Sequence, residues 1–139
     1  MDYLTQISAD EAAHVETLTS VITSLGGTPV AEGQYDVSSA LVDASAFLAT
    51  AMALENTGVS AYTGAAQYLI DNDELLTAAL TIHGVEARHA AYLNILNEEN
   101  PFPDAFDKPL TPAEVVEIAG PFIVEAEVVT PLAAATPVA

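Results

Sequence analysis

Three long stretches of the sequence repeat apolar residues at the spacing of an α-helix, and this pattern constrains the fold more than any other feature. They run from about Tyr3 to Leu25, from Asp43 to Ile70 and from Asp73 to Asn97. The first ends at two glycines, which favour a helix C-terminus. Only the turn "DND" separates the other two, with Asp73 as the predicted N-cap, so we expect antiparallel neighbours. No strand pattern is present, and the predicted fold class is all-α.

The C-terminal part of the chain predicts one short helix between irregular segments. Prolines exclude a helix from "NPFPDAFDKP". Thr111 then caps a helix with Pro112 in its first turn and Glu114 at the capping-box position, ending near "GPF". The tail is rich in Ala and Pro. We therefore expect one helical domain over residues 1–126, with three long helices and a short one, and an irregular tail over residues 127–139.

The charge balance excludes some partners. Asp and Glu number 20 against 2 Lys and Arg, a formal net charge of -18, and such a surface repels the phosphates of nucleic acids. The sequence contains no Cys, so disulfides and thiolate ligands are excluded. No apolar run approaches the ~18 residues of a membrane span, so we expect a soluble protein without membrane contact.

The cellular location stays open at this stage. The polar, acidic start of the chain does not resemble a signal peptide, although a mature or trimmed product would also lack one. High salt would screen the surface charge, so a secreted or extracellular protein in a saline setting is compatible with the sequence.

Carboxylates and histidines interrupt the apolar faces of the predicted helices. In the first helix that face comprises Leu4, Ile7, Val15, Leu18, Ile22 and Leu25. Glu11 and His14 lie within it, Glu55 lies at the centre of the second helix's apolar face, and Glu86 and His89 lie within that of the third. A buried carboxylate is costly unless it is paired, protonated or bound to a cation.

The spacing of these residues points to a metal site. In Glu-x-x-His both side chains lie on one helix face and can reach the same ion. Bridging carboxylates with one His on each ion suit Fe or Mn in an oxygen-rich site. Glu-x-x-His on two helices with single Glu residues on the others is the pattern of di-iron and di-manganese carboxylate bundles. The predicted ligands are Glu11, His14, Glu55, Glu86 and His89.

Each of these residues also has a simpler interpretation. Glu11 could close a capping box with Ser8, and Glu55 could accept a hydrogen bond from Tyr62 or a nearby backbone group. His14 and His89, taken singly, could be ordinary core histidines. His83 lies at the edge of the third helix's apolar face, where it would support a ligand rather than bind metal. Tyr62 would pack in the core or tune a nearby metal.

Several motifs occur in an order that resembles a known family. They are "DEAAHVETL" with "GGTPV", "ALENTGVSAYTGAA", "VEARHAAYL", "PFPDAFDKPLTPAEV" and "GPFI". Together they resemble the ferritin-like domain of desiccation-related and stress-response proteins of plants, fungi and bacteria, over the chain to about Ile123. The resemblance implies a four-helix bundle with a dinuclear metal site. It places Glu11 and His14 on the family's second helix, Glu55 on its third, and Glu86 and His89 on its fourth.

The sequence departs from that family at its start, where the first bundle helix and its Glu are missing. Three explanations are open. The sequence is a fragment of a longer chain that carries this helix; a second subunit or the C-terminal segment with Glu125 or Glu127 replaces it; or the site is incomplete and holds no metal. Three helices would also leave an apolar side exposed. We therefore expect a homo-oligomer or a partner helix that completes the bundle.

The resemblance implies a redox protein that acts on Fe(II), dioxygen or peroxide in stress protection, and it identifies no catalytic residue. Two other functions fit the residues. One is a metal-free protective assembly of acidic helices without turnover, in which the buried Glu and His residues bond to one another. The other is weak, salt-sensitive sequestration of cations by the surface charge. The ligand set does not distinguish Fe from Mn.

Overall fold

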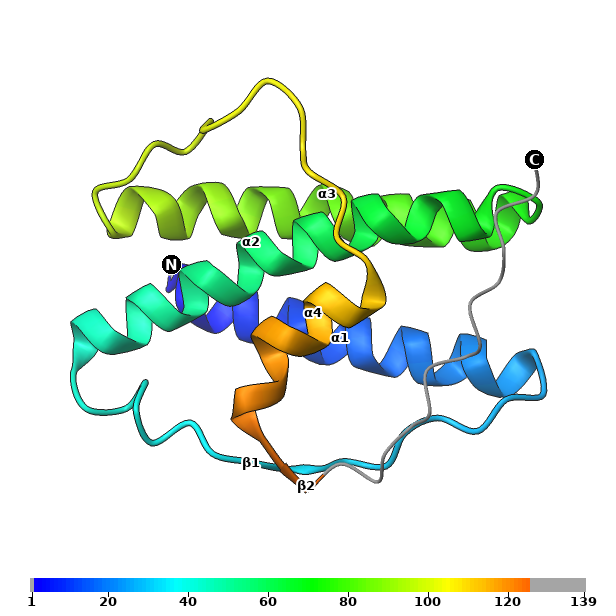
Figure 1. Ribbon diagram of the computed structural model, residues 1–139, viewed down its shortest axis with the longest axis horizontal. Coiled ribbons are helices and arrows are strands. Elements are labelled where there is room, and N and C mark those ends of the chain that lie inside the picture. Colours follow the sequence, from blue (N-terminus) through cyan, green and yellow to red (C-terminus); the bar gives the residue numbers. More distant parts are fainter. Residues whose placement is uncertain (1, 126–139) are drawn as a thin grey trace. The chain divides into compact units, whose positions relative to one another are not determined.

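The computed structural model describes residues 2–125 and is mostly helical (Figure 1). In chain order the elements are α1 (Tyr3–Ser24), β1 (Gln34–Tyr35), α2 (Ala44–Leu69), α3 (Asp73–Leu96), α4 (Pro112–Ala119), a 3-10 turn η1 (Gly120–Phe122) and β2 (Ile123–Glu125). The predicted three long helices and one short helix are confirmed. The predicted tail over residues 127–139 and Glu127 lie outside the described residues. The chain forms two compact units, divided between Glu32 and Gly33.

The first unit consists of α1 and the segment that follows it. Asp2 caps the helix by accepting a hydrogen bond from the backbone N–H of Leu4 at 3.1 Å. Gly26 ends it with a φ of 79°, a left-handed conformation that glycine adopts without strain. On the predicted apolar face, four residues are exposed, at 38–65%: Val15, Leu18 and Ile22 of α1 and its C-cap Leu25.

The second unit is built on α2 and α3, which lie side by side and run antiparallel, as predicted (Figure 1). Near the centre of α2, the side-chain amide of Asn56 donates to Asn94 Oδ1, near the end of α3, at 2.9 Å. Near one end, the amide of Asn97 donates to the backbone oxygen of Leu48 at 3.0 Å. The late part of α3 therefore lies against the early part of α2, and Asn94 is buried in the contact.

The turn between α2 and α3 differs from the prediction at its cap. Asn72, not Asp73, caps α3, and its side-chain oxygen accepts from the backbone N–H of Leu75 at 3.0 Å. Asp73 is instead the first helical residue, where its charge interacts favourably with the positive end of the helix dipole. Either residue can cap a helix, so the sequence alone did not separate them.

Residues 98–111 cross over α2 without regular structure. The backbone N–H of Leu110 donates to the carbonyl of Ser60 at 3.0 Å. One helical turn later, the backbone of Leu110 lies so close to Gly64 that a Cβ there would be only 2.9 Å from the Leu110 carbonyl carbon. The absence of a side chain at Gly64 therefore lets this segment reach α2.

The end of the described chain contains the predicted capping box and a strand pair that the sequence did not indicate. The capping box of α4 is present, since the Thr111 hydroxyl oxygen accepts from the backbone N–H of Glu114 and the Glu114 carboxylate accepts from that of Thr111. The all-α fold class is confirmed, although β1 and β2 form a short antiparallel pair that no strand pattern in the sequence indicated. A pair this short is held by backbone hydrogen bonds and leaves no alternating apolar pattern in the sequence.

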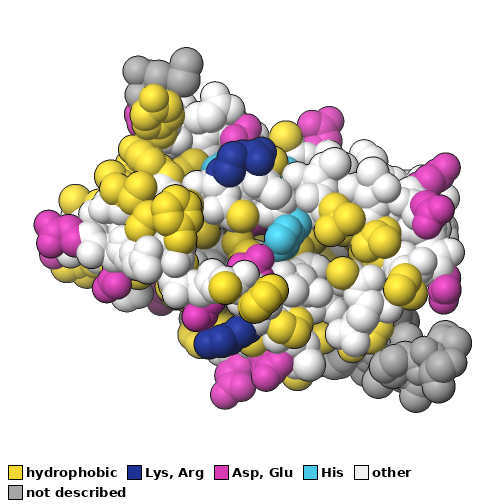
Figure 2. All heavy atoms as spheres, turned by 90° about the horizontal axis from the view of Figure 1, so that it is seen from above, with side chains coloured by type: hydrophobic (Ala, Val, Ile, Leu, Met, Phe, Trp, Pro, Cys, Tyr) yellow, Lys and Arg dark blue, Asp and Glu magenta, His cyan; other side chains and the backbone are white. Residues whose placement is uncertain are grey.

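The surface is acidic, as the composition predicts. Figure 2 shows carboxylates spread over one face of the molecule among apolar side chains, with few basic groups. Within residues 2–125, no helix combines the length and hydrophobicity that crossing a membrane requires.

Candidate metal centre

α2 and α3 bring three of the predicted ligands together inside the second unit. Glu55 lies near the middle of α2, and Glu86 and His89 lie one turn apart on α3. One donor atom from each residue lies within 4.8 Å of the others. Glu86 and His89 are 5% and 7% exposed, which confirms that they lie on the buried face of α3.

Glu55 and His89 approach each other within this group. The distance from Glu55 Oε2 to His89 Nδ1 is 3.5 Å, and their side chains are 11% and 8% exposed. This distance exceeds that of a good hydrogen bond, about 2.7–3.2 Å. Two atoms this far apart can both lie about 2.1 Å from one ion, the usual distance from N and O ligands to small divalent cations. The spacing therefore fits a shared cation as well as it fits an ion pair.

Two features of the helix pair surround the group. Next to Glu55 along α2, Asn56 forms the hydrogen bond with Asn94 that fixes the helices against each other. One turn after Glu55, Gly58 faces the Glu86 carboxylate: a Cβ there would lie 3.5 Å from Glu86 Oε2. The position thus has room for a methyl group and little more. Because Gly58 has no side chain, the Glu86 carboxylate can occupy the space beside it.

The first unit holds the remaining two predicted ligands as a pair of their own. Glu11 and His14 lie three residues apart on α1, and Glu11 Oε1 is 3.4 Å from His14 Nδ1. Ser8 lies inside α1, whose cap is Asp2, so the capping-box interpretation of Glu11 was wrong. The Glu-x-x-His motif therefore occurs in each unit, as Glu11 and His14 in the first and as Glu86 and His89 in the second.

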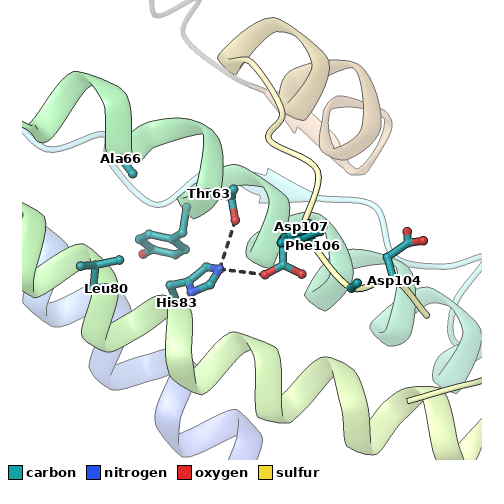
Figure 3. Close-up of a pocket in the computed structure, with 9 residues that line it drawn as sticks. Thr63, Ala66, Leu80, His83, Asp104, Phe106 and Asp107 are labelled. Atoms are coloured by element: carbon teal, nitrogen blue, oxygen red, sulfur yellow. Dashed lines mark hydrogen bonds and ion pairs between the residues drawn. The ribbon is translucent and has the colours of Figure 1, made fainter. Parts of the chain in front are cut away.

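The two residues expected to surround the metal, Tyr62 and His83, both line a cavity of about 540 Å³ in the second unit. Figure 3 shows His83 between Thr63 of α2 and Asp107 of the crossing segment. His83 Nε2 is 3.1 Å from the Thr63 hydroxyl and 3.6 Å from Asp107 Oδ2. The His83 side chain is 24% exposed, so it lies at an edge, as predicted.

Sequence reasoning missed Thr63, Asp107 and Gly58. Asp107 lies in a segment read only as proline-rich and non-helical, and no local signal pairs it with His83 twenty-four positions earlier. Gly58 does lie one turn after Glu55 on the predicted face. That spacing could have indicated that a facing side chain needs room there.

The donor set fits the metals that the sequence suggested. Two carboxylates and an imidazole in a buried group suit Fe or Mn, because carboxylate ligands favour harder cations and imidazole binds first-row transition metals. A cation would also offset the cost of burying two carboxylates between apolar helices.

Comparison with known proteins identifies the family of the chain. The sequence matches the family model described as a ferritin-like domain over residues 1–99. A search of curated proteins found no matching relative. The matched region includes α1, α2 and α3 and every predicted ligand. The chain therefore belongs to the ferritin-like domain family.

Proposed function

We propose that this protein holds a dinuclear Fe or Mn centre with Glu11, His14, Glu55, Glu86 and His89 as its ligands. The observation that carries the proposal is the buried group of Glu55, Glu86 and His89, with donor atoms within 4.8 Å of one another. The contribution of Glu11 and His14 follows from the repeated Glu-x-x-His motif and from the family resemblance, which assigns both pairs to one site.

The ligands have distinct roles in this proposal. The carboxylates of Glu55 and Glu86 would offset the positive charge of the ions. His14 and His89 would each supply a nitrogen ligand. The bound metals would supply one-electron redox chemistry. The helices keep water away from the buried ligands, which strengthens every electrostatic interaction there.

The proposed activity is oxidation of Fe(II) or removal of peroxide in stress protection. It rests on the chemistry of the donor set and on the resemblance to desiccation-related and stress-response proteins. The test is consumption of Fe(II) and of hydrogen peroxide by protein reconstituted with Fe or Mn, beside the double variant Glu86→Gln, His89→Ala. We expect turnover that the double variant loses. Equal rates in both proteins would refute a role for this centre.

The alternative function is a metal-free protective assembly. The 3.5 Å approach of Glu55 to His89 favours it, because the two side chains can neutralise each other without a cation. The alternative predicts that protein purified without chelator contains no Fe or Mn. It also predicts that protection of a test enzyme during drying survives the double substitution.

We further propose that the protein forms a homo-oligomer or takes up a partner helix. The exposed apolar residues of α1 support this, since a row of such residues on a free surface promotes association. Light scattering coupled to size-exclusion chromatography tests self-association. A replacement of Val15 and Leu18 by Glu should then reduce the measured mass, and an unchanged monomer mass in both proteins would exclude a homo-oligomer.

A further inference from the structure

A second cavity lies where the crossing segment, residues 98–111, passes over α2 and α3 (Figure 1). Its volume is about 360 Å³, and its lining is mostly apolar. On α3 the lining includes the alanines Ala87, Ala90 and Ala91, and the crossing segment contributes Phe102. The alanines recur at helical spacing, so one strip of α3 carries only methyl groups and leaves space beside the segment. Cavities of this size and lining are typical of sites for small organic molecules.

Two asparagine side chains, Asn56 of α2 and Asn94 of α3, also line this cavity, and their hydrogen bonds fix which atoms they present. The Asn56 amide nitrogen donates to the backbone oxygen of Met52 at 2.8 Å and to Asn94 Oδ1 at 2.9 Å. The Met52 oxygen can only accept, so the Asn56 atom that faces it is the nitrogen, and both of its N–H groups are used. Asn56 Oδ1 therefore remains as an acceptor, and the NH₂ group of Asn94 remains as a donor.

These two remaining groups have no hydrogen-bond partner among residues 2–125. Asn94 is only 6% exposed, so bulk water has little access to its amide. A buried donor without an acceptor is costly, and a bound molecule that accepts there removes the cost. Because the two side chains bond to each other, their remaining donor and acceptor lie close together. A primary carboxamide matches that pair, since its carbonyl oxygen accepts and its NH₂ group donates.

The charged groups around the cavity favour an uncharged ligand. Arg88 lines it together with Asp104 and Asp107. Asp104 already pairs with Lys108, since Lys108 Nζ lies 3.6 Å from Asp104 Oδ2. Two cationic and two anionic side chains therefore surround the cavity, and a ligand with a net charge of either sign gains little from them.

We propose that this cavity binds a small uncharged molecule that carries a primary carboxamide on an apolar body. The NH₂ group of Asn94 donates to the carbonyl oxygen of the ligand, and Asn56 Oδ1 accepts from its N–H. The apolar body lies against the alanines of α3 and against Phe102. None of the proposed metal ligands lines the cavity, so this inference stands independently of the metal centre.

Benzamide is the probe, because it carries the carboxamide directly on a small apolar ring. NMR titration of isotope-labelled protein measures its binding, and we expect shifts at the Asn94 side-chain amide and at the backbone N–H of Phe102. A Kd on the order of 1 mM is the scale for so small a ligand. Acetophenone, which has a methyl group in place of the NH₂, should bind about tenfold more weakly because Asn56 Oδ1 then receives no donor. Equal affinity for the two probes would overturn the choice of a carboxamide.

Asn94→Asp keeps the oxygen that accepts from Asn56 but replaces the NH₂ donor by a second acceptor, so benzamide should bind about tenfold more weakly. Asn100→Asp is the matched control, because Asn100 is exposed and does not line the cavity. Its oxygen still accepts from the backbone N–H of Phe102, and we expect unchanged binding. Ala91→Leu fills the cavity, leaves both amides intact and should abolish binding. Undiminished binding in Asn94→Asp or Ala91→Leu, equal weakening in Asn100→Asp, or no shifts at the cavity of the unsubstituted protein would each overturn the site.

Discussion

Replacement of Gly64 by Ala should destabilise the protein, although alanine is normally the better helix residue. Gly64 lies inside α2, under the backbone of Leu110. A Cβ there would overlap the Leu110 carbonyl oxygen and lie 2.9 Å from its carbon and 3.1 Å from its nitrogen. These are backbone atoms, so rotation of a side chain cannot relieve the overlap. The crossing segment has to move away from α2.

The magnitude follows from three opposing effects. Alanine in place of glycine gains about 1 kcal/mol in a helix interior. The added methyl group costs roughly 1–3 kcal/mol, the usual penalty for an extra methyl in a packed contact. Displacement of Leu110 also weakens its 3.0 Å hydrogen bond to Ser60, worth about 1 kcal/mol. We therefore expect a net loss of about 1–3 kcal/mol in the free energy of unfolding.

Urea denaturation followed by circular dichroism measures this loss. Gly84→Ala is the matched control, since Gly84 lies inside α3 and a Cβ there would meet only the guanidinium of Arg88, at 3.8 Å. The control should raise the unfolding free energy by up to about 1 kcal/mol. A Gly64→Ala protein as stable as the Gly84→Ala protein would refute the close approach of Leu110.

Three further predictions follow from single contacts. Asn94→Ala should lower the unfolding free energy by about 1–3 kcal/mol in urea melts, because the Asn56 amide loses a buried acceptor; an unchanged stability would contradict that bond. The hydrogen bond from the Thr111 backbone N–H holds the pKa of Glu114 below its ordinary value. The contribution of this hydrogen bond to stability is therefore present at neutral pH and is lost as the pH falls through the lowered pKa. Glu114→Gln should therefore lose less stability than the unsubstituted protein between melts at about pH 7 and about pH 3. Gly58→Leu should weaken Mn²⁺ binding about 10–100-fold in calorimetry by crowding the Glu86 carboxylate, whereas Gly58→Ala should bind as the unsubstituted protein does.

The sequence predicts the helices well because their signals are local. Apolar periodicity placed α1, α2 and α3 within a residue or so of their observed ends. The capping box at Thr111 was visible as a motif, and so was Gly26 at the end of α1. The same periodicity placed Glu86 and His89 on the buried face of α3. Each of these features depends on residues within one or two turns.

The features that the sequence could not predict depend on contacts between distant segments. The pairing of β1 with β2 joins Tyr35 to Ile123. The contact of His83 with Asp107 depends on where the crossing segment lies over α2, which Gly64 determines through close packing and not through a motif. The prediction of Asp73 instead of Asn72 as the cap of α3 was wrong for a different reason, since the two adjacent residues have equal capping ability.

The most direct test of the central proposal is the metal content per chain, measured by elemental mass spectrometry on protein purified without chelator. We expect about two Fe or Mn per chain, the content of a dinuclear carboxylate centre, and its loss in the Glu86→Gln, His89→Ala variant. Values near zero in both proteins would contradict a metal centre. The buried Glu55, Glu86 and His89 would then serve the fold alone.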